Sequence, residues 1–168
     1  MLKRHFAGLA LALVAISLVA CGDAPESGRG IVAVSSINGG VPISSSAAVA
    51  GDLIIPCEFR FRPYNSFVDI TEASPHGDII IESYTVSWTR SDGGSGVIPS
   101  RSEVTSIFLS VYEPAIGSIR MVSAAEKGDP ALSTLPATLI AHIDFVAREM
   151  GSEHDMEFST EATVSFTN

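Results

Sequence analysis

The sequence predicts an all-β domain that follows an apolar N-terminal segment. After residue 30, runs of alternating apolar and polar residues recur along the chain, and a period of two is typical of a strand with one buried face. Short groups of Gly, Pro, Asn and Ser separate these runs, and no amphipathic helix is evident after residue 20. These observations predict antiparallel strands packed as a sandwich.

The 168 residues divide into three predicted parts, namely 1–20, 21–30 and 31–168. A basic head with Lys3 and Arg4 precedes a run without charge, Phe6 to Ala20, whose 15 residues are fewer than the roughly 20 that a spanning helix needs. This is the pattern of an export signal, so we expect residues 1–20 to form a cleavable signal helix. Residues 21–30 are small and polar, which predicts a tether that extends to about 30 Å.

The residues Leu18, Val19, Ala20 and Cys21 end the apolar run. With the basic head and apolar core, they resemble the lipobox signal of bacterial lipoproteins, a resemblance that covers about the first 23 residues. It implies that the Cys21 thiol receives a diacylglycerol, that cleavage precedes Cys21, and that fatty acyl chains such as palmitate anchor the protein. A thiol is a strong nucleophile, and at about 0.8 kcal/mol per buried methylene, two or three chains hold a protein firmly.

Gly22, not Asp, directly follows Cys21. In cells with two membranes, the same resemblance implies delivery to the outer membrane rather than retention in the inner one. The alternative is an ordinary cleaved signal or an uncleaved anchor, with Cys21 incidental.

Charge and cysteine content exclude several classes of protein. Without Lys3 and Arg4, eight of the ten basic residues remain against 19 acidic ones, a net charge of about −11. This balance argues against a nucleic-acid partner, which needs a basic patch. If Cys21 is lipidated, Cys57 has no partner within the chain, and its apolar surroundings predict a buried core thiol.

The first half of the domain contains three predicted strands. They are Ile31–Ile37, Leu53–Arg62 and Ile79–Arg90, whereas the polar residues 44–46 receive no assignment. Because Pro56 lacks an N–H, the second strand should lie at an edge or contain a bulge. In the third, Tyr84, Val86 and Trp88 face one way and hydroxyl side chains face the other.

The second half continues the pattern. Strands are predicted at Ser106–Tyr112 and Gly117–Ala124, with Val122 on the face opposite Met121. A loop with at most one helical turn spans residues 125–136, and a hairpin of Ala137–Arg148 and Met156–Phe166 ends the chain. In its first strand, Leu139, Ala141, Ile143, Phe145 and Ala147 should face inward. The strand pattern resembles immunoglobulin-like or fibronectin type III-like domains, but the paired cysteines of antibody domains are missing.

The best polar constellation comprises His142, Asp144, His154 and Asp155. The first two share the outward face of a strand, and the last two lie in the adjoining loop. Imidazole and carboxylate groups bind metal where they converge, but His142 lies well below the loop. We therefore favour a solvated outer face and expect neither metal nor cofactor.

The chain has no nucleophile elbow, phosphate loop or metalloprotease motif, so we do not expect an enzyme. We expect a lipid-anchored protein of the cell envelope that binds an envelope or surface protein through exposed strand edges. A carbohydrate- or small-ligand-binding module is the alternative, with Trp88, Tyr84, Tyr112 or Tyr64 as stacking rings. A second alternative is an enzyme whose site is assembled from scattered residues.

Overall fold

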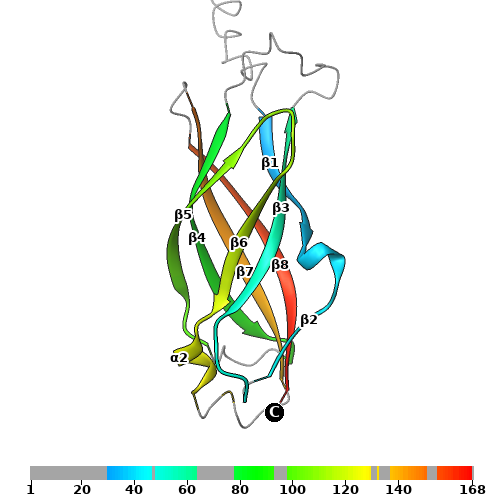
Figure 1. Ribbon diagram of the computed structural model, residues 1–168, viewed down its shortest axis with the longest axis vertical. Helices are drawn as coiled ribbons and strands as arrows, with labels where there is room; N and C mark the ends of the chain where they lie inside the picture. Colours follow the sequence, from blue (N-terminus) through cyan, green and yellow to red (C-terminus); the bar gives the residue numbers. More distant parts are fainter. Residues whose placement is uncertain are drawn as a thin grey trace, which may run out of the picture.

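The computed structural model describes residues 30–46, 48–63, 78–92, 98–129, 132, 137–150 and 155–167. Two β-sheets face one another, and both run along the long axis of the molecule (Figure 1). The all-β, two-layer architecture predicted from the sequence is therefore confirmed. The predicted signal helix (1–20), Cys21 and the tether up to residue 29 lie outside the described residues.

The small sheet has three antiparallel strands in the order β1-β3-β6. They are β1 (Gly30–Ile37), β3 (Leu53–Pro63) and β6 (Ala115–Val122). The large sheet has five strands in the order β2-β8-β7-β4-β5. They are β2 (Ile43–Ser46), β8 (Asp155–Thr167), β7 (Ala137–Glu149), β4 (Ile79–Arg90) and β5 (Arg101–Leu109).

The chain crosses from the small sheet to the large one directly after β1. The 3-10 helix η1 (Asn38–Gly40) makes this turn, and its three residues all have positive φ, a region that Gly and Asn tolerate best. β2 then pairs in parallel with the last residues of β8, from Val164 to Thr167. This is the only parallel pairing among the described strands.

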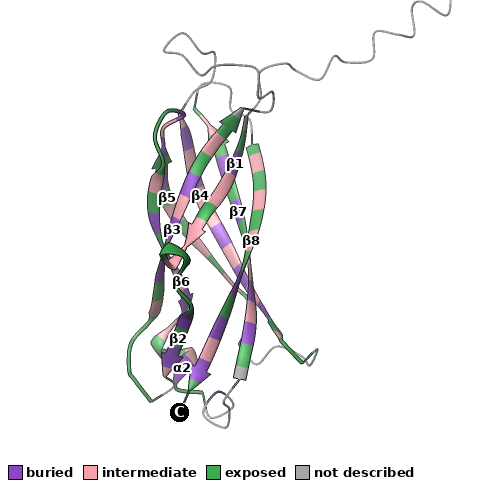
Figure 2. Cartoon of the chain, turned by 90° about the vertical axis from the view of Figure 1, so that its right-hand side faces the viewer, coloured by how far each residue is buried: buried purple, intermediate pink, exposed green. Residues whose placement is uncertain are grey.

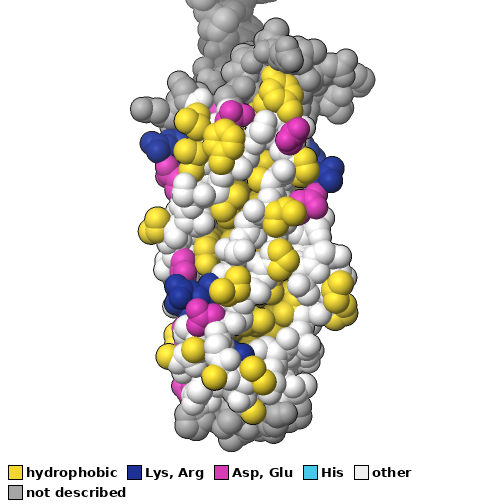
Figure 3. All heavy atoms as spheres, in the orientation of Figure 1, with side chains coloured by type: hydrophobic (Ala, Val, Ile, Leu, Met, Phe, Trp, Pro, Cys, Tyr) yellow, Lys and Arg dark blue, Asp and Glu magenta, His cyan; other side chains and the backbone are white. Residues whose placement is uncertain are grey.

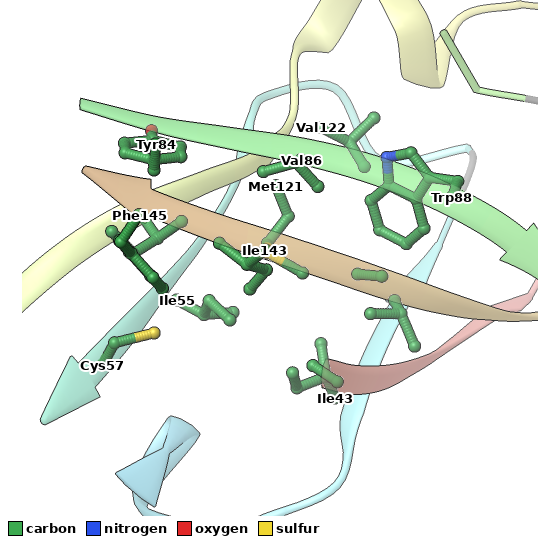
Figure 4. Packing of buried hydrophobic residues seen from close by; sticks show 14 of the residues in the cluster. Ile43, Ile55, Cys57, Tyr84, Val86, Trp88, Met121, Val122, Ile143 and Phe145 are labelled. Carbon is green, nitrogen blue, oxygen red and sulfur yellow. The ribbon is translucent and has the colours of Figure 1, made fainter. Parts of the chain in front are cut away.

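The inward faces of the two sheets form one hydrophobic core (Figures 2 and 4). All five residues predicted to face inward in the strand at 137–148 are buried, as are Tyr84, Val86 and Trp88. Phe145 stacks on Phe158 with a centroid separation of 5.0 Å and meets Phe59 of the small sheet edge-to-face at 5.2 Å. Aromatic contacts therefore join the two layers.

Two irregularities interrupt the strict alternation. In β4 the register shifts at Glu82, so Ile81 and Tyr84 both face the core although they are three positions apart. In β6 the register shifts at Met121, and both Met121 and Val122 are buried. The prediction that Val122 faces away from Met121 is therefore wrong, because a bulge adds one residue and changes the face of everything after it.

Pro56 lies within β3, which is the central strand of the small sheet rather than an edge. β1 pairs only with residues 57–63, however, so at Pro56 the strand has a neighbour on the β6 side alone. The missing N–H is tolerated because β3 is locally an edge there.

Candidate interaction surface

The outward face of the large sheet carries mostly hydroxyl and charged side chains. Those on β4 and β7 include Ser83, Thr85, Ser87, Thr89, His142, Asp144 and Arg148. On β8, Glu157, Ser159, Glu161 and Thr163 are all exposed. The predicted alternation of inward and outward side chains is confirmed on β7 and β8, and on β4 from Tyr84 onward, although the outward residues Ile140 and Val146 of β7 are apolar.

His142 is held at the centre of this face by neighbours on both sides. Its Nε2 lies 2.9 Å from Oγ1 of Thr89 on β4, and its Nδ1 lies 2.8 Å from Oε1 of Glu161 on β8. Each ring nitrogen therefore has a partner, and the imidazole bridges three strands.

The other residues of the predicted constellation do not join His142. Asp144 lies opposite Thr85 and Ser159 in the sheet register. Asp155 pairs with Arg148, six residues along β7 from His142, which corresponds to about 20 Å of strand. His154 lies outside the described residues. Among those that the structure describes, no group of three His, Cys, Asp or Glu side chains is placed to hold a metal ion.

Two of the four aromatic residues considered for ligand stacking are buried. Trp88 is 6% exposed and meets Phe166 edge-to-face at 6.1 Å, while Tyr84 is 3% exposed. Tyr112 is 50% exposed in the turn after β5, and Tyr64 lies outside the described residues. Trp88 and Tyr84 therefore serve the core and offer no stacking face to a sugar.

Cys57 of β3 is a free thiol in the core between the two sheets (Figure 4). Burial raises its pKa to about 12 because the apolar surroundings disfavour the thiolate. A nucleophilic cysteine needs a lowered pKa and access to substrate, so Cys57 has the properties of a core residue.

Along one side of the sandwich, a charged network joins the edge strands of the two sheets. Arg120 of β6 donates from Nε and Nη2 to the carboxylate of Glu103 on β5, at 2.9 and 2.8 Å. Arg101 lies 2.8 Å from Glu103 and also donates to Glu126 of the short helix α2 (Ala124–Lys127). Adjacent basic and acidic side chains are visible over this region, at the lower left of Figure 3.

Tyr84 and Asp52 extend this network to backbone groups. The Tyr84 hydroxyl accepts a hydrogen bond from the Arg120 N–H at 2.9 Å, and Asp52 accepts one from the Ala124 N–H at 2.7 Å. Hydrogen bonding lowers the pKa of Asp52, chiefly through Ala124, and that of Glu103, chiefly through Arg120. These contacts satisfy groups at the edge of β6 and fasten this side of the sandwich.

On the opposite side of the sandwich, β1 and β8 approach one another, but no charged network joins them among the described residues. β2 covers only Val164–Thr167 of β8, and no described strand pairs with the same side of residues 155–163. β1, the outer strand of the small sheet, lies beside β8 here (Figure 2). We call residues 155–163 of β8 the open edge, and it presents unpaired backbone groups.

Sequence reasoning did not identify the charged network or locate the open edge. The network residues are far apart in the chain, and each resembles an ordinary surface charge. The open edge follows from the short length of β2, a strand whose polar residues Ser44–Ser46 gave no strand signal.

None of the helices that the structure describes is both long and apolar enough to cross a membrane. No protein-family model, curated protein sequence or solved structure matches this chain.

Proposed function

We propose that this protein is a lipid-anchored, non-enzymatic component of a bacterial cell envelope that presents its β-sandwich to a partner protein. The open edge of β8 is the observation that carries this proposal, because unpaired strand backbone can bind an extended segment of another chain. The lipobox-like residues Leu18–Cys21 support the anchor, with Cys21 as the acylated residue. Gly22 after Cys21 favours the outer membrane in a cell with two membranes.

The sandwich is proposed to be of the immunoglobulin-like type. The order β1-β3-β6 matches strands A, B and E of such domains, and β8-β7-β4-β5 matches G, F, C and C′. Trp88 on β4 supports this because a buried Trp on strand C is a hallmark of antibody domains.

Growth with labelled palmitate tests the anchor. The wild-type chain and Cys57→Ala should both incorporate label, because the core thiol is not the acylated one, whereas Cys21→Ala should not. Incorporation that survives Cys21→Ala would overturn the assignment of Cys21.

Crosslinking in intact cells tests partner binding. The anchored protein should co-purify with one specific envelope protein across several crosslinkers. Recovery of the protein alone with every crosslinker would contradict the proposed role.

A further inference from the structure

The open edge has the dimensions of a strand-binding site. It runs from Asp155 to Thr163, about 30 Å of extended chain. Beyond it, β2 already occupies the same side of β8 and pairs with Val164–Thr167. A further strand placed on the open edge would therefore continue the line of β2 and leave the order of the other strands unchanged.

The apolar side chains along this side are only partly buried, and they determine which residues an added strand should direct inward. Met156 and Phe158 of β8 point inward but are only partly buried, as are Val34 and Ile37 of β1. A hollow of about 350 Å³ lies where the open edge meets β2. Its lining includes Ile37, Val41, Pro42 and Ile43. An occupant should carry apolar residues at alternate positions to cover these side chains.

The outward face of the open edge is acidic. Asp155, Glu157 and Glu161 are exposed there. Glu161 contacts His142 at 2.8 Å and Asp155 lies opposite Arg148, whereas Glu157 lies opposite Val146 and has no basic side chain across from it on β7. Opposite charges on adjacent strands stabilise pairing, whereas like charges directly opposite destabilise it. The outward residues of an occupant should therefore be basic or carry hydroxyl groups.

The same charges disfavour a second copy of this chain as the occupant. Antiparallel pairing of two open edges over their full length is centred on Ser159. This register places Glu157 of each copy opposite Glu161 of the other, which is unfavourable.

We propose that residues 155–163 bind an extended segment of a partner protein in which apolar residues alternate with lysine, arginine or hydroxyl residues. This inference rests on the proposed function and specifies the chemistry of the partner. The segment adds a strand to the large sheet, its apolar side chains cover Met156 and Phe158, and a basic side chain lies beside Glu157.

Fluorescence anisotropy with the full chain purified in detergent tests the proposal. The probe is a labelled peptide of about nine residues, within the usual range of strand lengths, with valine at alternate positions and lysine or threonine between them. Saturable binding is expected. A peptide with glutamate in place of lysine should bind at least about tenfold more weakly, and N-methylation of alternate residues should abolish binding because the backbone donors are lost.

Two charge-reversed variants provide matched controls. Glu157→Lys should weaken binding of the basic peptide by about tenfold, whereas Glu113→Lys, the same change in the exposed turn after β5, should leave it unchanged. Thermal unfolding of both variants verifies that they are folded. Equal binding of the N-methylated peptide, equal effects of the two variants, or no peptide binding would each overturn the strand-acceptor site. None of these results would affect palmitate incorporation or co-purification in cells, which test the proposed function separately.

Discussion

Tyr84→Phe removes a single hydroxyl group from the contact between the two sheets. In the native protein this group accepts a hydrogen bond from the Arg120 N–H at 2.9 Å and lies 3.4 Å from Glu103. The phenyl ring would keep its packing beside Phe145. The variant therefore isolates one polar contact between β4 and the edge of β6.

The expected loss in the free energy of unfolding is about 1–2 kcal/mol, since a partly buried N–H left without a partner costs about 1–3 kcal/mol and some water reaches this edge. The melting temperature should fall by about 2–8 °C. Urea unfolding followed by Trp88 fluorescence measures the loss. Ser118→Ala removes an exposed hydroxyl from β6, two residues from Arg120, and should change stability by less than about 0.5 kcal/mol. A Tyr84→Phe loss no larger than that of Ser118→Ala would show that the hydrogen bond from the Arg120 N–H does not stabilise the contact between the sheets.

Three further predictions concern the charged network, the core thiol and the close contact at Gly117. The folded-state pKa values of Glu103 and Asp52 lie below their ordinary values of 4.5 and 3.8, so the stability that these carboxylates contribute is complete above the ordinary values and is lost as the pH falls through the folded-state values. The urea midpoint should therefore fall less steeply with decreasing pH in Glu103→Gln than in the wild type. An equally steep fall in the two proteins would contradict this. Cys57, with its pKa raised to about 12, should react with a thiol reagent only after urea unfolding, and rapid modification of the native protein would show that it is accessible. Gly117→Ala should destabilise the fold by about 1–3 kcal/mol, because an added Cβ would overlap the Ile107 side chain and crowd Phe59. Adding Ile107→Val to the Gly117→Ala variant should recover part of the loss in melting temperature. No recovery would point to a different cause of the destabilisation.

The strands with uninterrupted alternation could be predicted from the sequence. The inward residues of β7, from Leu139 to Ala147, are buried as the pattern predicts, because both the period and the burial are local properties of the strand. The bulges at Glu82 and Met121 could not be predicted in the same way. Each depends on the register with neighbouring strands, which the local pattern does not contain.

The charged network and the open edge depend on contacts between distant residues. Arg120 meets Glu103 and Asp52 only after the two sheets pack together. The open edge arises because β2 is short and pairs with the far end of β8. The sequence did predict that His142 and Asp144 lie on an outward strand face, because their alternation with Ile143 is local.

The proposed lipid anchor can be tested by the mass of the N-terminal peptide of the mature protein, purified from membranes of the native host. We predict that this peptide begins at Cys21 and carries a diacylglyceryl group on the thiol, with residues 1–20 removed. A peptide that begins at another residue, or that carries an unmodified Cys21, would contradict the proposed lipid anchor.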